Sequence, residues 1–269
     1  MPAEALRAFL LALQFFTRIP VVGRVADWAG FTPERLRAAA GHFPGVGWIV
    51  AACACAVYAG SSWLWGDGMA VPLAAAVACT GATALLTGAF HEDGLADVAD
   101  GLGGSADRER ALDIMKDSRI GAYGALALVL GVGGKLALLA VLGGHGLAPV
   151  LAALVGGHVF SRFLPLLLVR SLPHVGDTAR SKSKPLADRI SVASMATAAF
   201  WCLPPAVLLL VWRGPAFVGL GVLFAAAALW WLRRLFVRRL GGFTGDCLGA
   251  AQQACEIAFY AGAAAALAR

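Results

Sequence analysis

The sequence has few charged residues. Only 14% of its 269 residues are Asp, Glu, Lys or Arg, whereas 59% are apolar and the mean hydropathy is +0.75. A soluble domain usually carries about 25% charged residues, so this composition excludes a soluble globular fold. The length and the long apolar runs instead predict six or seven membrane spans of about 20 residues each.

Cysteine is also scarce, and its spacing excludes two kinds of site. The six cysteines lie mostly inside apolar runs, without the paired spacing of a zinc site or a secreted disulfide framework. We interpret them as small buried apolar side chains. The net charge of +6 does not indicate nucleic-acid binding, because excess Lys and Arg in a membrane protein mark its cytoplasmic loops. The cysteines are Cys53, Cys55, Cys79, Cys202, Cys247 and Cys255.

Seven apolar segments follow one another along the chain. The residues before them, 4–16, form an apolar helix that is too short to cross a bilayer and is predicted to lie at the interface. The predicted fold is therefore all-α: a polytopic helix bundle with six or seven transmembrane helices, in one domain over residues 1–269. The predicted spans are residues 43–65, 69–90, 122–142, 147–169, 192–212, 216–232 and 247–268.

Basic residues gather on one side of this topology. With the N-terminus in the cytoplasm, the cytoplasmic loops hold 18 of the 22 Lys and Arg residues, and the opposite side holds two. This asymmetry follows the positive-inside rule and fixes the predicted orientation. The basic stretch 180–189 is interpreted as an anchor of this kind rather than as a substrate clamp. The cytoplasmic loops are residues 1–42, 91–121, 170–190 and 233–246.

Half of the sixteen acidic residues fall within residues 92–117. Asp93, Asp97 and Asp100 have the spacing that places them on one helix face, and Asp113 and Asp117 form a second such pair. Like charges so arranged repel, so a cation should compensate them, and oxygen-only ligands suit Mg²⁺ or Mn²⁺. The alternative is a solvated acid-rich loop. The candidate metal ligands are Glu92, Asp93, Asp97, Asp100, Asp113 and Asp117.

The segment 116–124 contains groups that bind anions. Arg119 can make bidentate hydrogen bonds to a phosphate, and the glycines allow close backbone approach where the next span begins. Taken alone, this segment is equally well explained as an interface turn, but beside the Asp pairs it favours a phosphate site. Metal ions held by carboxylates commonly bind a diphosphate during phosphoryl transfer. The candidates are Ser118, Arg119 and Tyr123 for substrate binding and His91, Asp97, Asp100 and Asp117 for catalysis.

Two further polar clusters are predicted on the same side. His158 and Arg162 lie four residues apart within a span, where ionisable groups are functional candidates. Arg162 has a second interpretation as the structural partner of an Asp in the acidic cluster. Thr244 and Asp246 belong to a glycine-rich loop, and Asp246 either binds a ligand or caps the last helix. We count all four as candidates for substrate binding.

Six motifs occur in an order that resembles one family, adenosylcobinamide-GDP ribazoletransferase, also called cobalamin-5′-phosphate synthase. They extend over nearly the whole chain, and the acidic motif followed by Asp-Ser-Arg-x-Gly is highly specific. The motifs are Leu13-Gln-Phe-Phe-Thr-Arg-Ile-Pro20, Phe43-Pro-Gly-Val-Gly47, Gly88-x-x-His-Glu-Asp-Gly-Leu-Ala-Asp-x-x-Asp-Gly101, Met115-Lys-Asp-Ser-Arg-x-Gly-x-Tyr-Gly124, Ser161-Arg162 and Gly242-x-Thr-Gly-Asp246.

The resemblance implies a multi-pass enzyme of the bacterial inner membrane with its active site facing the cytoplasm. Such an enzyme joins adenosylcobinamide-GDP to α-ribazole or α-ribazole 5′-phosphate, releases GMP and uses Mg²⁺. Its partners would be these substrates and the lipid bilayer, with no nucleic acid. The oligomeric state, a homo-oligomer included, stays open.

Three other functions remain at this point. The Asp pairs resemble part of the CDP-alcohol phosphotransferase signature, although they are closer together and lack the Ala-Arg that should follow the first glycine. Membrane prenyltransferases use two Asp-rich motifs on separate, well-spaced helix pairs. A cation transporter with an acidic site would place carboxylates near the midpoints of spans, whereas these carboxylates lie at span ends.

Overall fold

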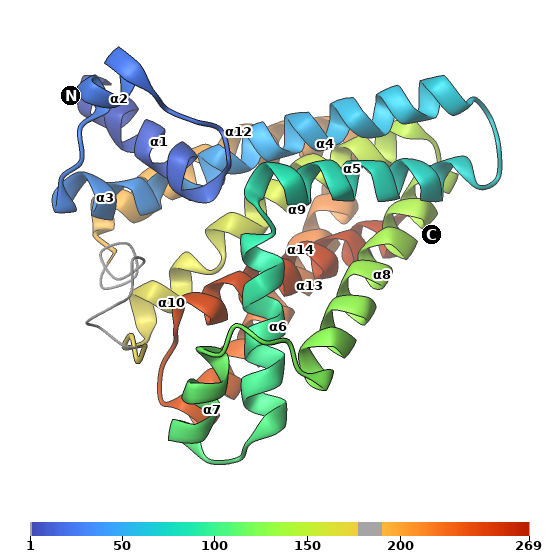
Figure 1. Ribbon diagram of the computed structural model, residues 1–269. Coiled ribbons are helices and arrows are strands. Elements are labelled where there is room, and N and C mark those ends of the chain that lie inside the picture. Colours follow the sequence, from blue (N-terminus) through green and yellow to red (C-terminus); the bar gives the residue numbers. More distant parts are fainter. Residues whose placement is uncertain (1, 177–189, 269) are drawn as a thin grey trace.

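Helices make up nearly all of the structure that the computed structural model describes, which covers residues 2–176 and 190–268. Within these two ranges no strand forms, and the only extended pairing is an isolated bridge between His174 and Phe243. The prediction of an all-α fold is confirmed (Figure 1). The basic stretch 180–189 lies outside the described residues.

A group of short helices precedes the long ones. The helix expected over residues 4–16 is α1 (Pro2–Phe16), and the next 26 residues add α2 (Gly23–Ala29), α3 (Pro33–Ala39) and the 3₁₀ turn η1 (Ala40–His42). Thr32 caps α3 by accepting a hydrogen bond from the Arg35 backbone, and the Arg35 side chain bonds Glu4 at 2.9 Å. This ion pair joins α1 and α3 at the surface, where the two helices also pack against each other.

Within residues 2–176 and 190–268, five helices are long and apolar enough to span a membrane. They are α4 (Phe43–Trp65), α8 (Ala122–Gly144), α9 (Leu147–Phe163) continuing into α10 (Leu166–Ser171), α12 (Val192–Arg213) and α13 (Pro215–Leu240). The structure thus supports five spans, or six with a bent pair, where the sequence predicted six or seven. The structure has fewer spans than predicted because neither α5 (Val71–Thr87) nor α14 (Gly245–Leu267) counts as a span by itself.

The chain turns by 90° between α5 and α6 (Phe90–Gly104), so the expected span 69–90 ends early. Gly88 and Ala89 both have positive φ angles, 70° and 55°, and this left-handed pair makes the bend. Glycine adopts such angles without strain, whereas Ala89 is an exception that the surrounding fold must hold in place. The bend carries the acidic segment away from the direction of α5 (Figure 1).

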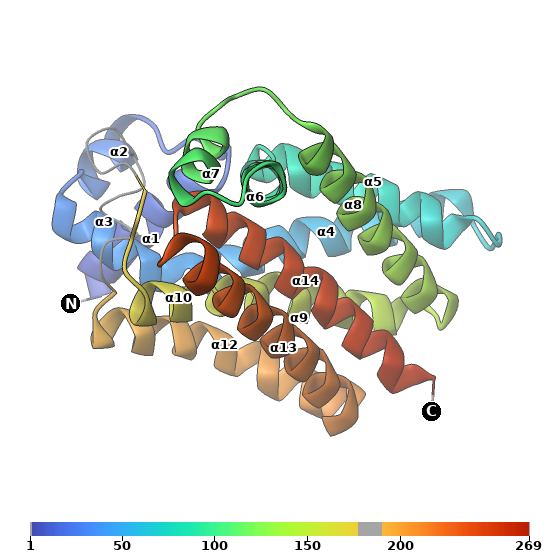
Figure 2. The same cartoon turned by 90° about the horizontal axis from the view of Figure 1, so that it is seen from below.

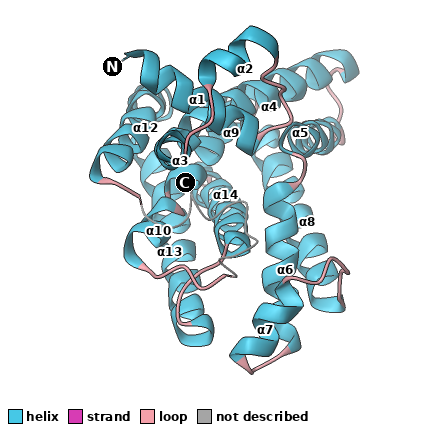
Figure 3. Cartoon of the chain, turned by 60° about the vertical axis from the view of Figure 1, so that its left-hand side comes forward, coloured by secondary structure: helices cyan, strands magenta, loops and turns pink. Residues whose placement is uncertain are grey.

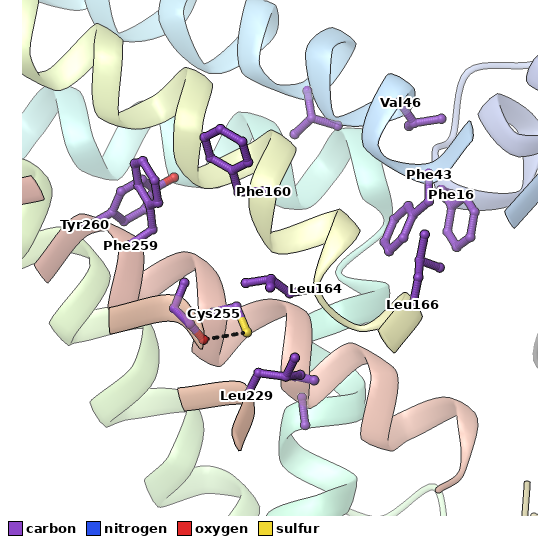
Figure 4. Close-up of a cluster of buried hydrophobic side chains, with 14 of the residues drawn as sticks. Phe16, Phe43, Val46, Phe160, Leu164, Leu166, Leu229, Cys255, Phe259 and Tyr260 are labelled. Atoms are coloured by element: carbon purple, nitrogen blue, oxygen red, sulfur yellow. Dashed lines mark hydrogen bonds between the residues drawn. The ribbon is translucent and has the colours of Figure 1, made fainter. Parts of the chain in front are cut away.

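The last helix, α14, runs through the middle of the bundle rather than along its edge (Figure 2). It packs on α13, α6, α9 and α8, and residues along its whole length are buried. Phe259 and Tyr260 meet Phe160 of α9 in the apolar core, and the Cys255 thiol lies against the backbone of α13 (Figure 4). Its two glutamines and Glu256 lower its hydropathy, which explains why α14 does not count among the five spans.

The arginine-rich segment after the sixth predicted span is also helical. Residues 233–239, expected in a loop, continue α13 to Leu240, where Gly241 ends the helix with a φ of 72°. Two of these arginines reach neighbouring elements: Arg239 donates to the carbonyl of Leu102 at 3.1 Å, at the end of α6, and Arg233 donates to the hydroxyl of Ser171 at 3.4 Å, at the end of α10. The expected polar stretch before α8 likewise contains a helix, α7 (Arg108–Met115).

Candidate active site

Three carboxylates meet where α6 crosses the beginning of α14. The helices touch at Gly94, where a Cβ atom would stand only 2.8 Å from the backbone oxygen of Asp246. Asp93 and Asp97 flank Gly94 on α6, and the charges of Asp93, Asp100 and Asp246 all act on the Asp97 carboxyl. We call Asp93, Asp97 and Asp246 the acidic face. Figure 3 shows α6 and α7 projecting together at this end of the bundle, beside the start of α8.

The part of the chain that the structure describes provides no cation that compensates the acidic face. Among the described residues, no Lys, Arg or His side chain forms an ion pair with Asp93, Asp97 or Asp246. The same residues contain no group of three His, Cys, Asp or Glu side chains already arranged around a metal position. Mg²⁺ typically takes one or two carboxylates and completes its shell with water and phosphate oxygens. The oxygen-only, unpaired donor set of the acidic face fits that requirement.

Asp100, predicted to bind metal and to act in catalysis, instead caps a helix. Its two carboxylate oxygens accept hydrogen bonds from the backbone amides of Gly121 and Gly124 at 2.7 and 2.8 Å. A Cβ atom on either glycine would overlap this carboxylate, so the side chain requires glycine at both positions. Carboxylates at helix N-termini bind free amides and complement the helix dipole. Asp100 therefore joins α6 to the beginning of α8.

The second predicted Asp pair lies on α7 and the turn that follows it. Asp113 is exposed and stands 3.8 Å from Lys116. Asp117 accepts hydrogen bonds from the Arg119 side chain at 2.5 and 2.9 Å and from its backbone amide at 3.1 Å. These bonds lower the pKa of Asp117 to about 2. The structure thus does not gather all six predicted metal ligands into one cluster.

The anion-binding candidates of segment 116–124 face outward. The Arg119 side chain is 86% exposed, and Ser118 is exposed as well. Arg119 is held in place by Asp117 through Nε and Nη2, so the rest of its guanidinium faces solvent. Tyr123 packs its ring on α6, where a Cβ at Gly103 would stand 2.5 Å from it. Arg119 and Ser118 are free to meet a ligand, and Tyr123 braces α6 against α8.

Asp246 is not the cap of α14. Thr244 holds that position, and its hydroxyl oxygen accepts a hydrogen bond from the Cys247 backbone at 3.3 Å. The same Thr244 hydroxyl donates to Asp246 Oδ2 at 3.3 Å and is buried. Thr244, predicted to bind substrate, therefore orients Asp246, which is partly buried at the acidic face.

His91 and Glu92 point into the bundle. His91 is 2% exposed, stacks on Phe43 at 5.6 Å between ring centres and lines an internal polar cavity. Glu92 lines the same cavity and accepts a hydrogen bond from Gln253 at 3.1 Å. The predicted roles, a base for His91 and a metal ligand for Glu92, require both side chains to lie on the acidic face. The structure places both behind that face.

His158 and Arg162 are buried too, and their acidic neighbour differs from the prediction. Both side chains are 2% exposed, and the nearby carboxylate is Glu256 of α14 rather than an Asp of the acidic cluster. Glu256 also pairs with Lys135 of α8 at 2.6 Å. We call Lys135, His158, Arg162 and Glu256 the buried network. In the sequence, the buried network is indicated only by isolated ionisable residues within the apolar stretches of three helices.

Comparison with known proteins places the chain in a family. Residues 8–264 match the family model of cobalamin-5-phosphate synthase. Relatives named adenosylcobinamide-GDP ribazoletransferase include proteins of Polaromonas sp. strain JS666, 56% identical over 98% of this chain and 99% of the relative, and of Polaromonas naphthalenivorans, 55% identical over the same shares. The Vibrio cholerae protein of that name is 41% identical over 95% of this chain and 92% of its own length. No solved structure matches. The chain therefore belongs to the cobalamin-5-phosphate synthase family of membrane enzymes.

Proposed function

We propose that this enzyme joins adenosylcobinamide-GDP to α-ribazole or α-ribazole 5′-phosphate and releases GMP, at the cytoplasmic face of the bacterial inner membrane. One observation supports this most directly: the carboxylates of the acidic face pair with no cation among the described residues, and the helix that carries two of them, α6, is joined through Asp100 to the start of α8. Membership of the family favours this transfer over a cation transporter or a prenyltransferase.

The acidic face would hold Mg²⁺. Bound Mg²⁺ would neutralise the oxygens of the diphosphate donor and stabilise the charge that develops on the leaving phosphate. Asp246 joins this set on structural grounds, because α14 brings it next to Asp93 and Asp97. Asp100 contributes by keeping α6 and α8 in register.

Arg119 is the residue best placed to bind a phosphate oxygen. Asp117 holds its Nε and Nη2 atoms, which fixes the direction of the guanidinium and leaves Nη1 available to a ligand. A guanidinium so oriented loses little further freedom when a phosphate binds. Arg119 therefore supports the departing GMP or the transferred phosphoryl group.

The proposed reaction is a phosphoryl transfer. The 3′-hydroxyl oxygen of α-ribazole forms a bond to the phosphorus that bears the corrinoid, and the bond from that phosphorus to the GMP oxygen breaks. The hydroxyl proton passes to a carboxylate of the acidic face. Asp97 suits this role because it is the central carboxylate of this group, between Asp93 and Asp100 on α6 and near Asp246 of α14. His91 does not, since it is buried behind this face.

A membrane assay tests the proposal. Membranes that contain the protein are given adenosylcobinamide-GDP, with and without α-ribazole and with and without Mg²⁺, and GMP is quantified. We expect release only when the acceptor and Mg²⁺ are both present. GMP release that does not depend on the acceptor, or full activity after chelation of divalent ions, would overturn the proposal.

A further inference from the structure

A small polar cavity lies inside the bundle, behind the acidic face. It has a volume of about 10 Å³ and opens between helices α4, α5, α6, α8, α9 and α14. A cavity needs roughly this much space, about one probe sphere, to hold one water molecule. Its polar lining comes from His91, Glu92, Lys135, His158, Arg162 and Glu256, with Gln253, Thr83 and Thr87.

Glu256 is the centre of the polar groups around the cavity. Its Oε1 atom lies 2.6 Å from Lys135 Nζ and accepts a hydrogen bond from the Tyr260 hydroxyl at 3.0 Å. Its Oε2 atom lies 3.2 Å from His158 Nδ1 and accepts a hydrogen bond from Gln252 at 2.7 Å. The side chains of Glu256 and Lys135 are only 1% and 4% exposed.

A chain of amides connects Glu256 with α6. Gln252 donates one hydrogen bond to Glu256, and its carbonyl oxygen accepts one from Gln253 at 3.0 Å. Gln253 donates its other hydrogen to Glu92 Oε1 at 3.1 Å. Glu92 lies in the first turn of α6, one residue before Asp93 and five before Asp97. The centre of the bundle is thus linked by three hydrogen bonds to the helix that carries most of the acidic face.

Four buried atoms around the cavity have no hydrogen-bond partner among the described residues. They are Arg162 Nε, Glu92 Oε2, His91 Nε2 and His158 Nε2. Three of these atoms belong to His91, His158 and Arg162, and each of these residues is at least 98% buried. Buried polar atoms are almost always paired with protein or with ordered water. One water molecule can accept from Arg162 Nε–H and donate to Glu92 Oε2 and to a histidine nitrogen, which are the three bonds typical of a buried water.

We propose that one ordered water molecule occupies this cavity and, together with Gln253, ties Glu92 to the buried network. Lys135, Gln253 and Glu256 are then positioning residues, which act on the reaction through the placement of α6. Neither end of this connection reaches the substrate. The kinetic part of the proposal rests on the proposed function, whereas the water site and the restraint on α6 do not.

A high-resolution map of the full-length protein in lipid nanodiscs tests the water site. We expect one density peak about 3 Å from Arg162 Nε and from Glu92 Oε2. An empty site, or side chains that have closed together and satisfied these atoms directly, would overturn the proposal.

Two variants test the restraint on α6. K135M/E256Q removes the charges of Lys135 and Glu256 together, which leaves the net charge of the buried network unchanged, and Gln253→Met removes only the amide link. For monodisperse protein we expect hydrogen exchange of residues 90–104 to accelerate in both variants, with exchange of α12 unchanged. We expect kcat to fall about 10- to 100-fold, because displacements near 1 Å have that effect, while KM for the donor changes less than about threefold.

The outcomes separate the two proposals. Wild-type exchange in α6 together with wild-type kcat in both variants would refute the positioning role. An inactive wild-type protein would refute the proposed function, and the exchange measurement would still decide this inference. If K135M/E256Q fails to insert, exchange and kcat of Gln253→Met, which changes no charge, decide whether the restraint exists.

Discussion

Carboxylates occur in two contrasting regions of this protein. On the acidic face, Asp93 and Asp97 are solvent-accessible and have no cationic partner in the described chain, although they stand beside Asp246. In the buried network, Glu256 is 1% exposed and surrounded by Lys135, His158 and Arg162. A buried carboxylate with every oxygen paired stabilises one arrangement of helices, because its charge is already neutralised. An accessible group of unpaired carboxylates retains its capacity to bind a cation.

The largest expected effect comes from the acidic face. Asp97→Asn should lower acceptor-dependent GMP release by roughly 10³-fold or more, since electrostatic stabilisation of the transferred phosphoryl group is lost. The yield of inserted protein should not change. Release is measured in membranes with matched protein content.

Glu109→Gln is the matched control for this variant. Glu109 is exposed and pairs with Arg108 on α7, outside the acidic face. Its activity should stay within about twofold of wild type, because exposed ion pairs contribute little. Equal losses in both variants would remove the distinction between the acidic face and other surface acids.

The second prediction concerns the buried network. Glu256→Ala leaves Lys135 and Arg162 buried without their carboxylate, so it should destabilise the protein by about 3–5 kcal/mol. The thermal midpoint in detergent should fall accordingly, whereas Asp97→Asn should leave the midpoint unchanged or raise it. If Asp97→Asn destabilises as much as Glu256→Ala, the proposed separation between binding and structural carboxylates is wrong.

The third prediction concerns Asp100, a buried carboxylate that accepts hydrogen bonds from backbone amides. Gly124→Ala places a methyl group against the Asp100 carboxylate and should cost about 1–3 kcal/mol of stability, as overpacking of a well-packed site does. Gly133→Ala is the control, because nothing lies within 4 Å of its Cβ position on the same helix. Equal midpoints in the two variants would contradict the capping role.

The smallest effect is expected at Asp117. Its pKa of about 2 is held down by Arg119, so Arg119→Gln should return the pKa towards the ordinary value of about 3.9. Because the pKa is lowered in the folded protein, the interaction is present above that ordinary value and is lost as the pH falls towards 2. A carbon-13 titration of the labelled carboxyl measures this. An unchanged pKa would show that Arg119 does not hold Asp117.

The sequence was sufficient for the class of fold and for the region of the site. Long apolar runs predicted the helices, and α4 begins and ends where it was expected, because Pro44 in its first turn and Gly66 after its end mark both boundaries. The acidic spacing placed Asp93 and Asp97 on one helix. These features could be predicted because they depend on the local periodicity of the sequence.

The remaining features depend on contacts between distant segments. Their spacing in the sequence places Asp97 and Asp100 on the same helix face, so the two residues were given the same predicted role. Only the position of the Gly121 and Gly124 amides shows that Asp100 caps α8. His158 and Arg162 were expected to bind substrate, and packing of α9 against α14 pairs them with Glu256 instead. The bend at Gly88 and Ala89 ends the straight part of the expected span 69–90 at Thr87, because tertiary contacts allow Ala89 a positive φ that its residue type disfavours.

The measurement that tests the central claim most directly is binding of Mn²⁺, used in place of Mg²⁺, to the purified enzyme with adenosylcobinamide-GDP present. Electron paramagnetic resonance reports the free ion. The proposal predicts a site in the wild-type protein that Asp97→Asn and Asp246→Asn weaken by at least about tenfold and that Glu109→Gln leaves intact. Wild-type affinity in both acidic-face variants would contradict it.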